Sequence, residues 1–132
     1  MFGFTDPATG RTRTSISPRA NTDAVGQALA DFAGWADPDG RKVPVVIADN
    51  AGWHVARTLA IPPDVVLHPP SCTPELQPAE PLWPLVREAL ANKTFPTLAA
   101  LEEPLGRRCQ WLAAHPDTVE GAVGFHWAVA LG

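Results

Sequence analysis

Two short apolar runs constrain the fold of this chain most strongly. The first covers residues 44–48 and stops at Asp49, and the second covers residues 64–68. Runs of this length, bounded by turn-forming residues, are typical of buried strands. Helical patterns lie before the first run, over residues 23–35, between the runs, over residues 53–59, and after the second run, from Leu82 onward. This alternation of strands and helices predicts an α/β architecture with at least one parallel pair of strands.

The segments around these runs also carry local signals. The sequences MFGF and RTRTSIS flank the turn-rich residues 6–10, which predicts a β-hairpin. Asn21, Thr22 and Asp23 offer N-cap chemistry for the helix over residues 23–35. A further short helical stretch is expected over residues 53–59.

The last third of the chain is expected to be helical. A face with i, i+3, i+4, i+7, i+8 spacing predicts a helix, and its members are Leu82, Leu85, Val86, Ala89 and Leu90. Another helix begins at Thr97 and is either continuous or broken near residues 104–106, because Pro104 lacks a backbone N–H. A short helix or turn then leads into the closing sequence GFHWAVALG.

Composition excludes several classes of protein. The 132 residues are 45% hydrophobic and 18% charged, which indicates a folded chain rather than a disordered one. No window approaches the roughly 20 apolar residues of a membrane span, and the N-terminus does not resemble a signal peptide. The net charge of −4 argues against a stand-alone nucleic-acid binder. Cys72 and Cys109 lack metal-ligand spacing, so we interpret them as structural thiols of a cytoplasmic protein, with a disulfide left open.

Two carboxylates stand at informative positions. Asp49 follows the first apolar run directly, and Glu80 precedes Pro81 at the expected start of a helix. If the two apolar runs are parallel neighbours, both acids reach one edge of the sheet. Converging carboxylates need a neutralising cation, and a hard cation such as Mg²⁺ prefers oxygen ligands. An ordinary strand end and a helix-capping Glu explain the same spacing, so both interpretations stay open at this point.

A longer, two-part pattern joins these segments. The sequence VVIADNAGWHVARTL is an apolar strand followed by Asp-Asn-Ala and a His, and VVLHPPSCTPELQPAEPLW is a second strand followed by a proline-rich series with Glu and Trp. This pattern resembles the catalytic core of mariner-like insertion-sequence transposases, the DDE-type endonucleases, as do the opening FGFTDPATGRT and the closing GFHW. The matching residues are Asp49, Asn50, Ala51, His54, Pro69, Pro70, Pro74, Glu75, Leu76, Pro78, Glu80 and Trp83.

The resemblance implies a fold and a chemistry. The expected fold is RNase H-like, a mixed sheet with flanking helices, over a single domain of residues 1–132. In that family three acids bind two divalent metals, Mg²⁺ or Mn²⁺. The enzymes use these metals to nick and join DNA strands at transposon ends. Asp49 matches the second acid and Glu80 the third, with Asn50, His54 and Gln77 as supporting residues. The implied partner is DNA, and the implied location is the cytoplasm of a bacterium, at the nucleoid when DNA is bound.

Two departures from the family pattern modify this expectation. The family's first acid lies on a strand before the FGFTDPATG hairpin, so the sequence predicts a fold that lacks its first central strand and an isolated chain that is nearly inactive. Such a chain is expected to form a homo-oligomer or to pair with a separate N-terminal transposase half. The alternative is a non-catalytic remnant that binds itself or an intact transposase through exposed strand edges. The second departure lies in the loop before Glu80, where Gln77 replaces the usual Asn and Cys72-Thr73 replaces an aromatic-Ser pair.

Other residues have a structural and a functional interpretation. Trp53 has the spacing either to stack on a base or to pack in the core, whereas Trp83 is expected in the core. His68, His115 and His126 show no partner spacing and are interpreted as structural. The candidates for phosphate contacts are scattered among acids and are more typical of a solvated face; they are Arg57, Arg87, Lys93, Arg107 and Arg108. The residues that would bind nucleic acid therefore stay unassigned.

Overall fold

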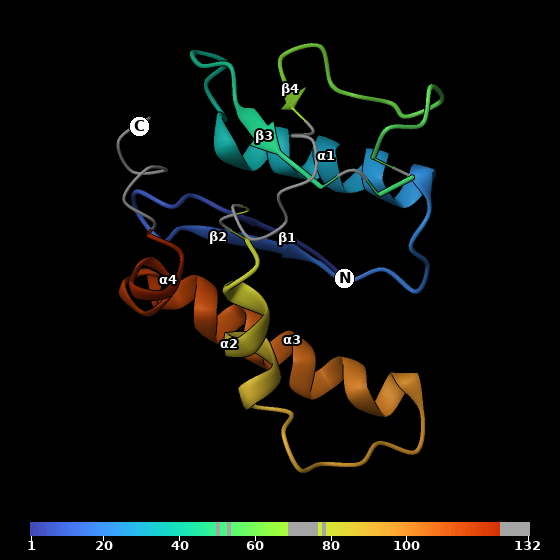
Figure 1. Cartoon of the computed structure of the whole chain (residues 1–132), viewed down its shortest axis with the longest axis vertical. Coiled ribbons are helices and arrows are strands. Elements are labelled where there is room, and N and C mark those ends of the chain that lie inside the picture. The colour runs from blue at the N-terminus through green and yellow to red at the C-terminus, as the bar shows by residue number, and fades with distance from the viewer. Residues whose placement is uncertain (50, 53, 69–76, 78, 125–132) are drawn as a thin grey trace. The chain divides into compact units, whose positions relative to one another are not determined.

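The computed structural model describes residues 1–49, 51–52, 54–68, 77 and 79–124. Its elements, labelled in Figure 1, are β1 (Phe2–Thr5), β2 (Thr12–Ser15), α1 (Thr22–Ala36), β3 (Val45–Ile47), β4 (Val66–His68), α2 (Leu82–Glu88), α3 (Leu98–Ala114) and α4 (Pro116–Val123). Within the described residues the strands form two small sheets, β1–β2 and β3–β4. The predicted α/β class is confirmed.

The chain forms two compact units. The first unit contains Met1–Phe2 and Ser17–Gln77, and the second contains Gly3–Ile16 and Pro78–Gly132. The first unit therefore holds α1, β3 and β4, while the second holds most of the N-terminal hairpin together with α2, α3 and α4.

Helix α1 forms where its apolar periodicity and its cap predict it. The Asn21 side chain accepts a hydrogen bond of 2.9 Å from the Ala24 N–H, which satisfies one of the donors that a helix start leaves unpaired. The helix buries one face of small and branched side chains, Val25, Ala28, Leu29 and Ala33. The predicted range of residues 23–35 differs from Thr22–Ala36 by one residue at each end.

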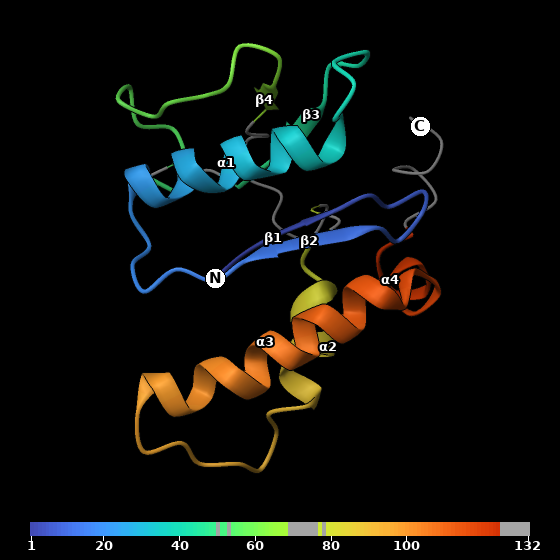
Figure 2. The same cartoon turned by 180° about the vertical axis from the view of Figure 1, so that it is seen from behind.

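Strands β3 and β4 pair in parallel, as predicted. Val45 lies opposite Val66 and Ile47 lies opposite His68. Strand β4 is shorter than its apolar run, because the Val65 N–H donates to the Pro62 carbonyl in a turn (3.0 Å) instead of joining the ladder, and β3 is one residue shorter than its run at each end. Figures 1 and 2 show α1 running alongside this pair of strands.

The short helix predicted over residues 53–59 is wrong. In the described part of this segment, the His54 N–H donates to the Ala51 carbonyl (2.8 Å) and the Leu59 N–H donates to the Ala56 carbonyl (3.0 Å), and both are isolated turns. Starting a helix costs more than one hydrogen bond returns, and a segment this short needs a buried apolar face to offset that cost. Val55 is 50% exposed, so burial does not supply the difference.

The N-terminal hairpin of the second unit is confirmed. Asp6 organises its turn: the side chain accepts hydrogen bonds from the Ala8 N–H (3.0 Å) and the Thr9 hydroxyl (2.8 Å). The Asp6 N–H in turn donates to the Arg11 carbonyl (2.9 Å), which closes the loop. Asp6 is therefore a turn residue, a role in which Asp is common.

Helices α2, α3 and α4 pack on one another and form the core of the second unit (Figure 2). Their buried side chains include Leu82, Val86, Cys109, Leu112, Val119 and Val123. Helix α2 ends at Glu88, so Ala89 and Leu90 of the predicted face lie beyond the helix. Helix α3 is continuous through Pro104. One missing N–H is tolerated in a 17-residue helix whose start is capped by Thr97. In the described part of the chain, no helix has both the length and the apolarity to cross a membrane.

Gly10 lies in the hairpin turn and comes close to the backbone of α4, so its substitution tests this packing. Its φ is +67°, and a Cβ at this position would lie 2.0 Å from the Pro116 carbonyl oxygen. We expect Gly10→Ala to lower the free energy of unfolding by about 1–2 kcal/mol for the left-handed backbone and about 1–3 kcal/mol more for the overlap. Urea unfolding followed by circular dichroism measures this change.

Gly40→Ala is the matched control for the backbone conformation. Gly40 has a φ of +64°, but a Cβ there meets nothing within 4 Å, so only the first of the two costs applies. Equal losses of stability in the two variants would contradict the close approach of the hairpin turn to α4.

Candidate functional site

Asp49 lies at the carboxyl end of the β3–β4 ladder. The Ala48 N–H donates to the His68 carbonyl (3.2 Å), and Asp49 is the next residue. Ala48 is buried, whereas the Asp49 side chain is 48% exposed. Binding sites of α/β folds form outside the carboxyl ends of parallel strands, and Asp49 has this location.

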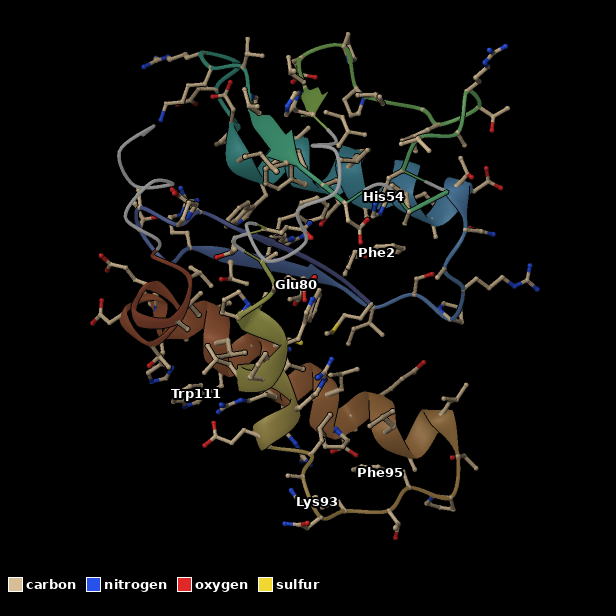
Figure 3. The ribbon with its side chains drawn as sticks, in the orientation of Figure 1. Phe2, His54, Glu80, Lys93, Phe95 and Trp111 are labelled. Atoms are coloured by element: carbon tan, nitrogen blue, oxygen red, sulfur yellow. The ribbon has the colours of Figure 1, made fainter. Side chains whose placement is uncertain are left out.

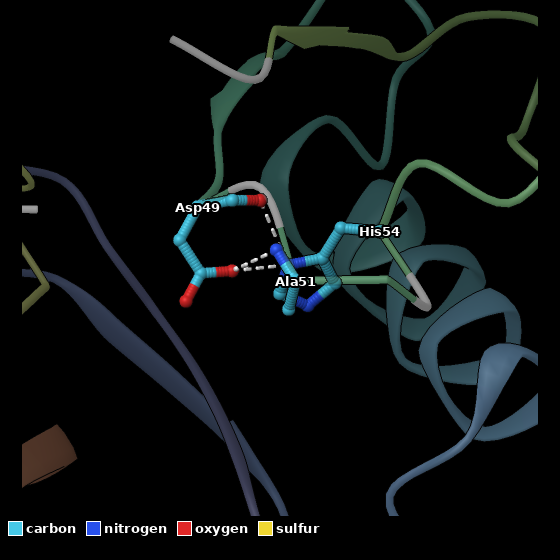
Figure 4. A network of polar contacts seen from close by, with 3 residues as sticks. All are labelled: Asp49, Ala51 and His54. Carbon is cyan, nitrogen blue, oxygen red and sulfur yellow. Dashed lines mark hydrogen bonds and ion pairs between the residues drawn. The ribbon is translucent and has the colours of Figure 1, made fainter. Parts of the chain in front are cut away.

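A compact network holds the Asp49 side chain (Figure 4). Its Oδ1 accepts a hydrogen bond from the Ala51 N–H at 3.3 Å and contacts His54 Nδ1 at 2.5 Å. The same ring nitrogen lies 3.1 Å from the Asp49 carbonyl oxygen. One imidazole nitrogen therefore bridges the backbone and the side chain of Asp49.

The two partners of His54 Nδ1 assign its hydrogen. A backbone carbonyl oxygen accepts hydrogen bonds and cannot donate them, so Nδ1 carries the hydrogen and donates. Asp49 Oδ2 accepts no hydrogen bond from the residues that the structure describes. A carboxylate on a half-exposed side chain fits a hard divalent cation, which prefers oxygen ligands and retains water.

Glu80 stands immediately before Pro81 at the start of α2, as predicted (Figure 3). Its side chain is exposed, and its carbonyl accepts a hydrogen bond of 3.2 Å from the Trp83 N–H. Gln77, another predicted site residue, is half-buried, while Asn50 and Trp53 lie outside the described residues. Among the residues that are described, no three His, Cys, Asp or Glu side chains gather as a metal site. The convergence of Asp49 and Glu80 on one cation stays a prediction.

Three of the five basic candidates are engaged within the protein. Arg107 pairs with Glu103 at 3.0 Å, and Lys93 Nζ donates to the Ala89 carbonyl at 2.8 Å. Arg108 Nε donates to the Leu85 carbonyl (2.8 Å), and its Nη2 pairs with Glu88 (3.0 Å). These contacts agree with the structural interpretation of the three side chains.

His115 has an aromatic partner that the sequence interpretation missed. Its ring stacks on that of Trp111 with centroids 4.0 Å apart and planes inclined by 17°. The Arg108 guanidinium lies 4.6 Å from the centroid of the same indole (Figure 3 labels Trp111). Arg108 lies three residues before Trp111, and His115 lies four residues after it, at the end of α3. This helical spacing is the signal that could have identified the cluster from the sequence.

Comparison with known proteins gives one relative. The uncharacterized protein y4pE/y4sA of Sinorhizobium fredii (strain NBRC 101917 / NGR234) is 35% identical over 97 residues, covering 72% of this chain and 70% of that protein. No family model matches the chain. No solved structure matches it either.

Arg108 and Arg107 are adjacent residues with different surroundings, which allows a matched test of the structural interpretation. The Arg108 side chain is 15% exposed and links α3 to α2, so we expect Arg108→Ala to lower the free energy of unfolding by about 1–3 kcal/mol. Arg107 is 69% exposed and pairs only along its own helix, so Arg107→Ala changes stability by at most about 0.5 kcal/mol.

Urea unfolding of the two variants measures both effects. Arg108→Lys is informative as well, because an ammonium lacks the planar fork that reaches Leu85 and Glu88 together. A stability of Arg108→Ala equal to that of the unmodified chain would contradict the structural role and would return Arg108 to the candidates for phosphate contacts.

Proposed function

We propose that this chain, which belongs to the same family as the y4pE/y4sA protein of Sinorhizobium fredii, carries part of the catalytic site of a mariner-like DDE transposase. Its reaction would be metal-dependent nicking and joining of DNA strands, on an RNase H-like fold. The observation that carries the proposal is the place of Asp49, at the carboxyl end of a parallel strand pair, with one carboxylate oxygen held by His54 and the other pointing away from it (Figure 4).

Asp49 would act as a metal ligand through Oδ2. Its Oδ1 is held by the Ala51 N–H and by His54, so the carboxylate has one oxygen engaged and one available. The available oxygen would serve as a ligand for Mg²⁺ or Mn²⁺, because these ions prefer oxygen ligands and keep several waters.

Glu80 would supply a second carboxylate. It is exposed at the start of α2, and the Pro81 ring limits the backbone directly after it. The resemblance implies three acids, of which Asp49 and Glu80 match two in this chain. When bound, the metal pair would activate a water or 3′-hydroxyl and stabilise the charge of the phosphoryl group.

A second candidate function has its own observation. Val45 and Val66 lie opposite each other in the β3–β4 pair, yet they are 63% and 49% exposed. Parallel strands are normally covered on both faces, and among the residues that the structure describes, β3 and β4 pair only with each other. In this alternative, the chain is a non-catalytic protein that associates with a second copy of itself through these strands.

Titration with Mn²⁺ tests the catalytic proposal. We expect the chain to bind Mn²⁺ and expect Asp49→Asn and Glu80→Gln each to weaken binding at least tenfold, because each removes a charged oxygen ligand while keeping its shape. Isothermal calorimetry or the electron paramagnetic resonance signal of free Mn²⁺ measures the dissociation constants.

Asp64→Asn is the matched control for this titration, since Asp64 is an exposed acid of the unit that holds Asp49 and no part of the proposal uses it. Equal weakening in all three variants would indicate a diffuse effect of charge, and unchanged binding in Asp49→Asn would refute a ligand role for Asp49.

Sedimentation equilibrium tests self-association. We expect a dimer that Val45→Lys converts into a monomer, because the new charge would be buried at the interface without a partner. Val55→Lys is the control, since Val55 is 50% exposed in the same unit but lies outside the strands. A wild-type chain that stays monomeric at the highest concentrations measured would contradict this second function.

A further inference from the structure

We infer that His54 is the positioning residue of the site: its Nδ1–H holds Oδ1 of Asp49 and so leaves Oδ2 as the ligating oxygen. This inference rests on the proposed function, because it assigns a role to His54 in metal binding by Asp49.

The first support is the number of contacts that one nitrogen makes. His54 Nδ1 lies 2.5 Å from Asp49 Oδ1 and 3.1 Å from the Asp49 carbonyl oxygen, so it contacts both ends of the same residue. A donor shared between backbone and side chain restricts the χ1 and χ2 torsions of Asp49 together. The Ala51 N–H, 3.3 Å from Oδ1, restrains the same oxygen from within the turn.

The second support is the exposure of the two side chains. The Asp49 side chain is 48% exposed, while that of His54 is 17% exposed. The carboxylate therefore meets solvent and a dissolved cation more readily than the ring does. A hydrogen-bonded partner behind a ligating group commonly fixes its orientation, and loss of such a partner weakens metal binding about 10–100-fold.

The turn explains why a histidine serves at this position. The His54 N–H donates to the Ala51 carbonyl at 2.8 Å, which brings its side chain back toward the end of β3 (Figure 4). The described backbone on either side of this turn is not helical, so a loose side chain at Asp49 would sample several rotamers. The imidazole contact limits that freedom before any cation arrives.

Two substitutions of His54 distinguish the role of its Nδ1 from that of its Nε2. The side-chain NH₂ of Asn lies where Nδ1 of His lies, whereas the amide of Gln reaches the place of Nε2. We therefore expect His54→Asn to bind Mn²⁺ within about threefold of the unmodified chain, and we expect His54→Gln and His54→Ala to bind it 10–100-fold more weakly.

A measurement without metal accompanies the titration. Long-range ¹H–¹⁵N correlation spectra of the metal-free chain report which nitrogen of His54 carries hydrogen. We expect the Nδ1–H form in the unmodified chain, and we expect the spectrum to lose this preference in Asp49→Ala, which removes the carboxylate that accepts the hydrogen bond.

Each outcome decides between the inferences. Mn²⁺ binding that needs Asp49, is retained in His54→Asn and is weakened in His54→Gln supports the positioning role. Binding retained in His54→Gln but lost in His54→Asn overturns it, since Nε2 would then act as a ligand. Binding that Asp49→Asn weakens but no His54 variant changes, or an Nε2–H form in the spectra, overturns it while leaving the proposed function intact. A wild-type chain that binds no Mn²⁺ overturns both.

Discussion

The backbone hydrogen bonds between β3 and β4 are the constraint on which the candidate site depends. The ladder runs from Val45 opposite Val66 to Ile47 opposite His68, and the Ala48 N–H extends it by one bond to the His68 carbonyl. Asp49 is the first residue beyond that bond, so its backbone is anchored while its side chain reaches solvent. Parallel pairing also places the carboxyl ends of both strands at one edge, which is where α/β folds bind ligands.

The turn after β3 distinguishes this strand end from an ordinary one. An Asp that accepts a hydrogen bond from the N–H two residues later is a common turn motif and has no functional meaning by itself. The contact of one His54 nitrogen with both the carbonyl and the carboxylate of Asp49 goes beyond that motif. It orients a charged group at a solvent-facing edge before a ligand is present, as a preorganised binding site requires.

The two proposed functions use different parts of the same pair of strands. The metal site would form at the carboxyl end, next to Asp49, whereas self-association would use the exposed Val45 and Val66 at the opposite end of the ladder. Metal binding and self-association therefore depend on different residues, and the substitutions that test one leave the residues of the other in place. A dimer formed through β3 and β4 would also cover apolar surface that a parallel sheet normally buries.

The elements of this fold that depend on local signals could be predicted from the sequence. The 3.6-residue period and the Asn21 cap predicted α1, the turn residues from Asp6 to Gly10 predicted the hairpin, and the place of Asp49 at a strand end followed from the apolar run before it. The parallel pairing was also expected, although the predicted helix between the two strands, which suggested it, is replaced by turns over residues 54–59. Each of these signals is carried by residues close together in the chain.

Other features required the tertiary structure, because distant contacts decide them. Burial determines whether a short segment becomes a helix, and residues 54–59 form turns although their local sequence favoured a helix. Helix α3 continues through Pro104, where the sequence left a break open, and the link from Arg108 to Leu85 spans 23 residues of sequence. Only three-dimensional geometry could choose Nδ1 of His54 as the donor to Asp49, because a sequence names the ring but not the direction in which it points.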